Sequence, residues 1–150
     1  MKTYRLHQEQ FVARPLHEVF AFFERPENLG RITPRSLGFV IVTPLPIEMK
    51  NGALIDYTIK VAGIRVRWQT LISDYDPPNR FVDEQRRGPY RLWLHTHRFV
   101  AVNGGTNIID DVCYCLPFGI FGQMAHALFV RHELRKIFRH REEIIRILFT

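Results

Sequence analysis

Two histidines, His95 and His97, are the side chains in this sequence best suited to acid–base chemistry near neutral pH. They lie in the segment 90–102, whose pattern predicts a β-strand. Residues two apart in a strand share one face, so Trp93 and Phe99 lie on the same side as both histidines. These aromatic neighbours indicate that the face points inward. The histidines could bind a ligand carbonyl or act as acid and base, or they could be structural residues bonded to backbone or carboxylate groups.

Cys113 and Cys115 lie on the next predicted strand, and together with the histidines they suggest a tetrahedral zinc site. A two-residue turn at 104–105 places cysteines and histidines on opposite faces of the sheet. A three-residue turn at 103–105 places Cys113 opposite His95. The sequence leaves this register open. The spacing of the cysteines is unlike that of zinc knuckles, so we expect no bound metal.

In the register of the two-residue turn, Asp110 and Tyr114 join the histidine face. His95 then lies opposite Tyr114, and His97 is a diagonal neighbour of Asp110. This arrangement makes His95, His97 and Tyr114 the candidate catalytic residues, with Asp110 either polarising a histidine or serving a structural role. Asp111 points to the other face and cannot share a substrate with Asp110. The sequence contains no nucleophile-elbow or phosphate-cradling glycine motif.

The elements that must position these groups are mostly strands separated by turn residues. A first strand is expected at 4–13, followed by a helix from 15 to 23 and a short helical turn at 26–32. Pro15 suits the first position of that helix, because its ring fixes the required backbone angle. Further strands are expected at 39–42, 54–61, 64–75, 80–86, 90–102 and 106–116.

A long helix is expected from 120 to 148, since this segment has no proline and no glycine after Gly122. Apolar residues recur along it at helical spacing, and its length is about 40 Å. The predicted fold class is therefore α+β, with a curved antiparallel sheet of six or seven strands wrapped around the C-terminal helix. Such a sheet cannot close tightly on one helix everywhere, which predicts an enclosed cavity of a few hundred Å³.

The same helix is basic, because six arginines and lysines between 131 and 146 exceed its three glutamates. A basic amphipathic helix can lie on an anionic membrane or meet a partner. We favour a core helix with a solvated face. Arg131 and Arg135 are four residues apart and could point inward near the cavity mouth.

The apolar segment 118–122 carries two glycines between the last strand and the helix. Phe118 and Phe121 flank the first glycine and could form a flexible gate into the cavity. The alternative is a tightly packed corner, and the sequence does not decide between them.

Length and composition limit the kinds of protein that this chain could be. The 150 residues fit a single domain at 1–150, with 46% hydrophobic and 24% charged residues. No apolar run reaches the ~20 residues of a membrane span, and the N-terminus has no secretory pattern. Two cysteines suggest a reducing compartment, so we expect a cytoplasmic protein without integral membrane association. The net charge of +6 is read as a solubility surplus, and no nucleic-acid partner is expected.

The chain resembles the helix-grip superfamily that contains START domains and pollen allergens, and more narrowly the ligand-binding SRPBCC branch related to polyketide cyclases. The resemblance covers nearly the whole chain and is carried by four segments: 14–23, 26–29, 88–99 and 114–119. The first two recur across the superfamily, whereas the others are typical of one uncharacterised subgroup.

The resemblance implies a hydrophobic cavity that holds a lipid, polyketide or aromatic-like molecule without a cofactor. We expect a binding or carrier protein. The alternatives are a cyclase or dehydratase-type enzyme and a regulatory module that uses the basic helix. Oligomeric state is not fixed by the sequence. The expected ligand-binding residues are Trp93, His95, His97, Phe99, Asp110, Tyr114, Phe118, Phe121, Met124, Leu128 and Arg131.

Overall fold

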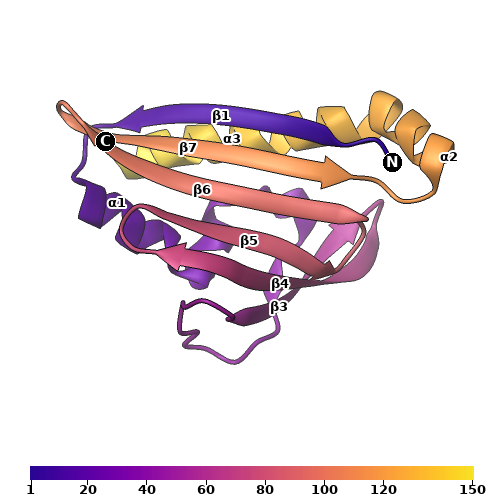
Figure 1. Ribbon diagram of the computed structural model, residues 1–150, viewed down its shortest axis with the longest axis horizontal. Coiled ribbons are helices and arrows are strands. Elements are labelled where there is room, and N and C mark those ends of the chain that lie inside the picture. The colour runs from indigo at the N-terminus through magenta and orange to yellow at the C-terminus, as the bar shows by residue number, and fades with distance from the viewer.

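Seven strands form one antiparallel sheet in the order β1-β7-β6-β5-β4-β3-β2, in a computed structural model that describes residues 1–150 (Figure 1). Neighbours in the sheet are mostly neighbours in sequence, as short turns require. The exception is β1, which pairs with β7 and so joins the first strand to the last. The strands are β1 (Tyr4–Val12), β2 (Val40–Ile41), β3 (Leu54–Val61), β4 (Ile64–Asp76), β5 (Arg80–Arg87), β6 (Leu92–Val102) and β7 (Gly105–Cys115).

Helical elements occur after β1 and after β7. The first group is α1 (Leu16–Phe23), with Pro15 preceding it, and the 3₁₀ turns η1 (Pro26–Ile32) and η2 (Arg35–Leu37). The second group is α2 (Gly119–Ala125), a π-helical turn η3 (His126–Val130) and α3 (Arg131–Leu148). Figure 1 shows α3 running along the sheet behind β1 and β7. The predicted α+β architecture is confirmed, and no helix is long and apolar enough to cross a bilayer.

The register of the β6–β7 hairpin differs from both sequence-based alternatives. Val102 pairs with Gly105, so the two-residue turn is Asn103-Gly104. Compared with the expected two-residue turn at 104–105, the pairing is shifted by one residue on each strand. Gly104 has a φ of 86°, which a residue with a side chain rarely adopts, and it therefore occupies the turn. His97 lies directly opposite Asp110, not diagonal to it, and His95 lies opposite Val112 instead of Tyr114.

Gly105 explains this difference. A Cβ on this residue would lie 2.1 Å from the carbonyl oxygen of Val12 in β1, so the residue has to be glycine because of a close strand approach. The sequence pattern alone assigns Gly105 to the turn, which is wrong. The cysteines still lie on the face opposite the histidines, because Leu94 pairs with Cys113.

The core is concentrated at the end of the molecule where α1 packs. Its largest buried cluster joins Phe20 and Phe23 of α1 to Phe99 of β6, Ile108 of β7 and Ile145 of α3. A second cluster, which includes Trp68, Trp93, Leu134 and Phe138, lies under the middle of the helix. At the other end, α2 and the β3–β4 turn do not meet over the sheet, and a cavity opens there.

Candidate functional site

A cavity of about 1090 Å³ lies between the sheet and the C-terminal helix. Its walls come from β3 to β6, from η1 and the segment that follows, and from the inner face of α2, η3 and α3. Twenty of the thirty lining residues are hydrophobic, so the site suits an apolar molecule. The aromatic lining residues are Phe39, Tyr57, Trp68, Tyr90, Trp93, Phe118, Phe121, Phe129 and Phe138.

A cluster of five charged or titratable side chains, which we call the buried cluster, closes the inner end of the cavity: Asp83, His95, His97, Asp110 and Arg141. His97 Nε2 donates to Asp83 Oδ2 at 2.5 Å, and His95 Nε2 donates to Asp110 Oδ1 at 2.8 Å. Arg141 reaches the same Asp110 oxygen from α3 at 3.1 Å. The two imidazole rings stack with centroids 3.6 Å apart. All members except Asp110 line the cavity.

The carboxylates of the buried cluster are ionised. Burial opposes the charge of Asp110, but Arg141 and the hydrogen bond from His95 outweigh it and hold its pKa below the usual range. Burial likewise opposes the charge of Asp83, and the hydrogen bond from His97 outweighs it, so its pKa is also lowered. Burial and the neighbouring His95 lower the pKa of His97 to about 4. His97 is therefore neutral at pH 7.

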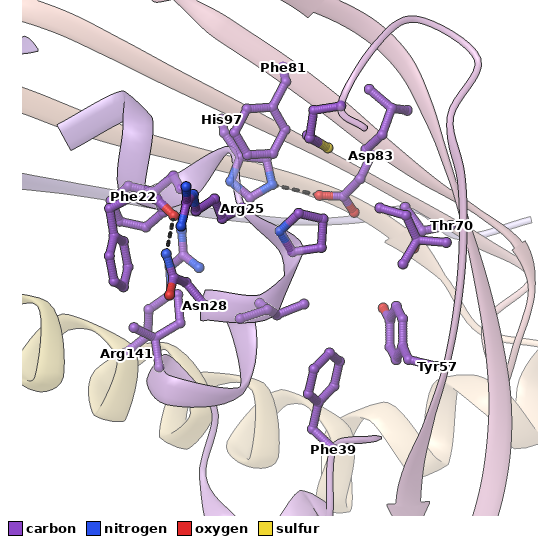
Figure 2. Close-up of a pocket in the computed structure, with 17 residues that line it drawn as sticks. Phe22, Arg25, Asn28, Phe39, Tyr57, Thr70, Phe81, Asp83, His97 and Arg141 are labelled. Carbon is purple, nitrogen blue, oxygen red and sulfur yellow. Dashed lines mark hydrogen bonds and ion pairs between the residues drawn. The ribbon is translucent and has the colours of Figure 1, made fainter. Parts of the chain in front are cut away.

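Several buried polar atoms around the cavity have no hydrogen-bond partner. They are His97 Nδ1, Arg141 Nε, Thr70 Oγ1 and Trp68 Nε1. Figure 2 shows the recess of about 80 Å³ that extends the inner end of the cavity, with Asp83, His97, Thr70 and Arg141 around it. Buried polar groups are normally paired, so these atoms are unsatisfied. They have almost no accessible surface, and His97 Nδ1 lies 3.5 Å from Asp110 Oδ1, so a guest molecule or water reaches them only when neighbouring side chains move.

Tyr114 is not part of this cluster, contrary to the sequence-based expectation. Its side chain is buried beside Trp93, but its hydroxyl bonds to His126 Nε2 of η3 at 2.7 Å. His126 in turn stacks on Tyr4 of β1 with centroids 3.5 Å apart. Tyr114 therefore faces a separate groove between β1 and the C-terminal helix, and it has no contact that would join it to His95 or His97 in acid–base chemistry.

The other expected ligand-binding residues divide among five locations. Trp93, Phe118 and Phe121 line the cavity together with the histidines. Asp110 is buried behind His95, and Phe99 belongs to the core under α1. Met124 and Arg131 line the groove next to β1, and Leu128 is 62% exposed and lines neither space. The last five residues do not line the cavity, and neither does Arg135, which faces the groove.

Sequence analysis missed Asp83 and Arg141. Asp83 is two residues from Phe81 in β5, and Phe81 stacks on His97, so alternation along this strand was the signal that could have identified it. Arg141 is only 5% exposed although it lies in a basic helix, and Phe23 and Phe138 flank its guanidinium. Arg141 lies three residues after Phe138 and four before Ile145, so its place on the apolar stripe of the helix was the signal that could have identified it.

Asp83, His95 and His97 are also the residues nearest to a metal-ligand arrangement, with ligand atoms within 4.8 Å of one another. Nearly parallel stacked rings direct their nitrogen lone pairs side by side, whereas a metal ion needs lone pairs that converge. Each carboxylate already accepts a hydrogen bond from an imidazole. The geometry fits a hydrogen-bonded cluster better than a metal centre.

Comparison with known proteins gives a likeness in structure alone. No family model matches the chain, and no curated protein is significantly similar to it. A Thermus thermophilus protein of known structure has 17% sequence identity and a TM-score of 0.73, covering 98% of this chain and 100% of the other. The Zhui aromatase/cyclase of a Streptomyces species shares 15% identity with a TM-score of 0.70 over 98% and 96% of the two chains.

A third similar structure is the major latex-like protein 151 of Panax ginseng, with 10% identity and a TM-score of 0.70. The alignment covers 98% of this chain and 97% of that one. At such low identities the likeness identifies the fold. The chain has the helix-grip fold that the sequence resemblance predicts.

Proposed function

We propose that this protein binds a small, mostly hydrophobic molecule whose polar group meets the buried cluster. The observation that carries the proposal is the cavity of about 1090 Å³, which has apolar walls and ends at Asp83, His97 and Arg141. Ligand pockets of about 300–1000 Å³ enclose most of a drug-sized molecule. A cavity of this size therefore suits a lipid, a polyketide or an aromatic compound.

The polar end of the ligand follows from the unpaired atoms. When a shift of neighbouring side chains opens these atoms to the cavity, a ligand hydroxyl donates to His97 Nδ1, or a ligand carbonyl oxygen accepts from Trp68 Nε1 or Arg141 Nε. Each new bond relieves a buried polar group that otherwise lacks a partner, which favours ligands with one or two oxygen atoms over pure hydrocarbons.

A second candidate function is a cyclase or dehydratase-type reaction on the bound molecule. It is supported by the neutral His97, which Asp83 orients and which carries a free ring nitrogen. Such an imidazole is unprotonated near neutral pH and can accept a proton from the bound molecule, but its pKa of about 4 makes it a weak general base. One of the similar structures is that of an aromatase/cyclase, which is in keeping with this chemistry. Tyr114 is not included, because its hydroxyl bonds to His126.

The binding proposal is tested with the fluorescent apolar probe 1-anilinonaphthalene-8-sulfonate. Trp68 and Trp93 are the only tryptophans and both line the cavity, so a probe bound there quenches their emission by energy transfer. Ile137→Trp would place a larger ring in the cavity from α3, whereas Ile147→Trp changes an exposed position of the same helix. Because each variant adds a third tryptophan, probe binding by the variants is measured from the emission of the probe itself. We expect at least tenfold weaker probe binding for the first substitution and unchanged binding for the second. Equal binding by both variants would refute the cavity as the binding site.

The two candidate functions are separated by the mass of the molecule that co-purifies with the protein. A carrier retains the same compound in the wild-type protein and in His97→Gln. A cyclase or dehydratase that needs His97 retains unconverted substrate in the variant, which is heavier by one water than the product of a dehydration. Identical masses would exclude the dehydrating enzyme.

A further inference from the structure

Six large apolar side chains are exposed on the segment that joins β7 to α3. Each is at least 55% exposed, whereas the apolar residues of α3 mostly face the interior. We call this segment the α2 surface; its members are Phe118, Ile120, Phe121, Met124, Leu128 and Phe129. Single exposed apolar residues are ordinary, but six gathered within twelve positions are the mark of an interaction surface.

Positive charge surrounds the α2 surface. No aspartate or glutamate occurs between Asp111 and Glu133. Ile120 and Met124 line the groove beside β1, where five cationic side chains face a single carboxylate, that of Glu142. The five cations, none of which forms an ion pair with a carboxylate, are Lys2, Arg5, Arg131, Arg135 and Arg139. Other basic residues, such as those of β4 to β6, mostly do form such pairs.

The α2 surface lies at the cavity mouth. Phe118, Phe121 and Phe129 belong both to the exposed surface and to the cavity wall. The tip of the β3–β4 turn lines the same opening with Val61, and Ile64 next to it is 69% exposed. Figure 1 shows that α2 and the N-terminus lie at the same end of the molecule.

We propose that the α2 surface docks on the surface of an anionic lipid bilayer, with the cavity mouth facing the lipid. The apolar side chains enter the boundary between headgroups and acyl chains, while the cations of the groove meet lipid phosphates. A second copy of the chain is a poorer occupant, because a twofold contact through this surface would place the same unpaired cations against each other. Docking does not depend on what fills the cavity.

The test is co-sedimentation of the purified chain with vesicles of phosphatidylcholine alone or of phosphatidylcholine mixed with phosphatidylglycerol. We expect binding to the anionic vesicles that weakens as salt is raised, since salt screens surface charge. Replacing Ile120, Met124 and Leu128 together by serine should reduce the partition coefficient by about tenfold or more, because three apolar side chains no longer enter the lipid. These three positions do not line the cavity, so probe binding there serves as the folding control.

Matched controls separate apolar insertion from general exposure of hydrophobic groups. Phe11, Val100 and Val102 are exposed near the β6–β7 turn, which Figure 1 places at the opposite end of the molecule from α2. Their joint replacement by serine should leave vesicle binding unchanged. Arg131→Gln and Arg135→Gln should each weaken binding to anionic vesicles about fivefold, the effect of one cation near a charged surface.

Three results would overturn the proposal. The first is wild-type protein that binds neither vesicle, which would leave an acidic protein partner as the occupant. The second is an equal loss of binding in the α2 and the Phe11 variants. The third is sedimentation of the wild-type chain as a dimer that the α2 substitutions dissociate, which would assign the surface to self-association.

Discussion

Asp110 anchors the buried cluster, because it accepts from His95 on the neighbouring strand and from Arg141 on the helix. This carboxylate is 2% exposed, and an unpaired charge at that depth would be strongly unfavourable. Arg141 balances its charge and ties α3 to the sheet at the inner end of the cavity. The cluster therefore supports the fold as well as the proposed site.

Removing Arg141 should destabilise the protein severely. Arg141→Met leaves Asp110 with His95 as its only partner, and breaking a buried pair in this way costs about 3–5 kcal/mol of unfolding free energy. The double variant Arg141→Met with Asp110→Asn should be less destabilised than the sum of the two single variants, because the uncompensated charge is gone. Urea unfolding measures all three. If the losses of unfolding free energy in the two single variants simply add up in the double variant, Arg141 and Asp110 do not form a stabilising pair.

Protonation of His97 should destabilise the folded state in acid. Its folded pKa of about 4 lies below the ordinary value near 6.5, so the unfolded chain binds a proton first as the pH falls. The free energy of unfolding should therefore decrease between pH 6.5 and pH 4, by up to ~3 kcal/mol from this group. The ionised Asp83 and Asp110 add their own loss below that window, since their folded pKa values are also lowered.

Equilibrium unfolding at a series of pH values measures this slope, and His97→Gln should flatten it between pH 6.5 and pH 4. The matched control is His17→Gln at an exposed position of α1, which should keep the wild-type slope. If His97→Gln keeps the full wild-type dependence of unfolding free energy on pH, other groups cause this dependence.

We expect no stoichiometric metal in the purified protein. The cysteines and the histidines lie on opposite faces of the sheet, and the stacked imidazoles do not converge on one point. Elemental analysis after purification without chelators should find less than stoichiometric zinc, and Cys113→Ser should not change it. Stoichiometric zinc that His97→Gln abolishes would show that Asp83 and the histidines rearrange around an ion.

At the scale of elements, the turn from β7 into α2 depends on three special positions. Phe118 adopts a left-handed φ of 69°, uncommon for a large residue, and Gly119 follows with 54°. A Cβ on Gly122 would lie 2.1 Å from the Pro117 carbonyl oxygen. The first turn of α2 can therefore pack on the strand end only with glycine at position 122.

Gly122→Ala should displace α2 from the end of β7 and change the cavity mouth. We expect lower thermal stability, by a few °C, and faster exchange of amide protons in α2. Gln123→Ala in the same helix is exposed and should alter neither property. Unchanged exchange in Gly122→Ala would show that the corner adjusts without moving the helix.

Strands could be predicted from the sequence better than their pairing. The predicted range 54–61 matches β3, and the long strands β6 and β7 were located within two residues, since their alternation is regular. The register of β6 and β7 could not be predicted, because the need for glycine at 105 comes from β1, almost a hundred residues away. The same limit applies to Tyr114, whose partner His126 lies beyond the corner.

At the scale of the whole molecule, the cavity results from a helix that fills only part of a curved sheet. Aromatic residues of α1 and Ile145 of α3 fill the end near Phe99, while α2 and the β3–β4 turn remain apart at the other end. A cavity could be predicted from the ratio of seven strands to one long helix. Its volume and the hydrogen bonds at its polar end depend on packing that sequence patterns do not encode. Strand alternation and helical spacing indicate only that Asp83 and Arg141 face inward.

Native mass spectrometry of the purified protein tests the binding of a small hydrophobic ligand most directly. We expect a complex of the chain with one molecule of a few hundred daltons, a mass range that suits a cavity of this size. This complex should be absent from Ile137→Trp and retained in Ile147→Trp, and the released molecule should carry at least one oxygen atom. A wild-type chain that is always free of ligand, and whose Trp68 and Trp93 emission does not change when the apolar probe is added, would show that the cavity is not a ligand-binding site.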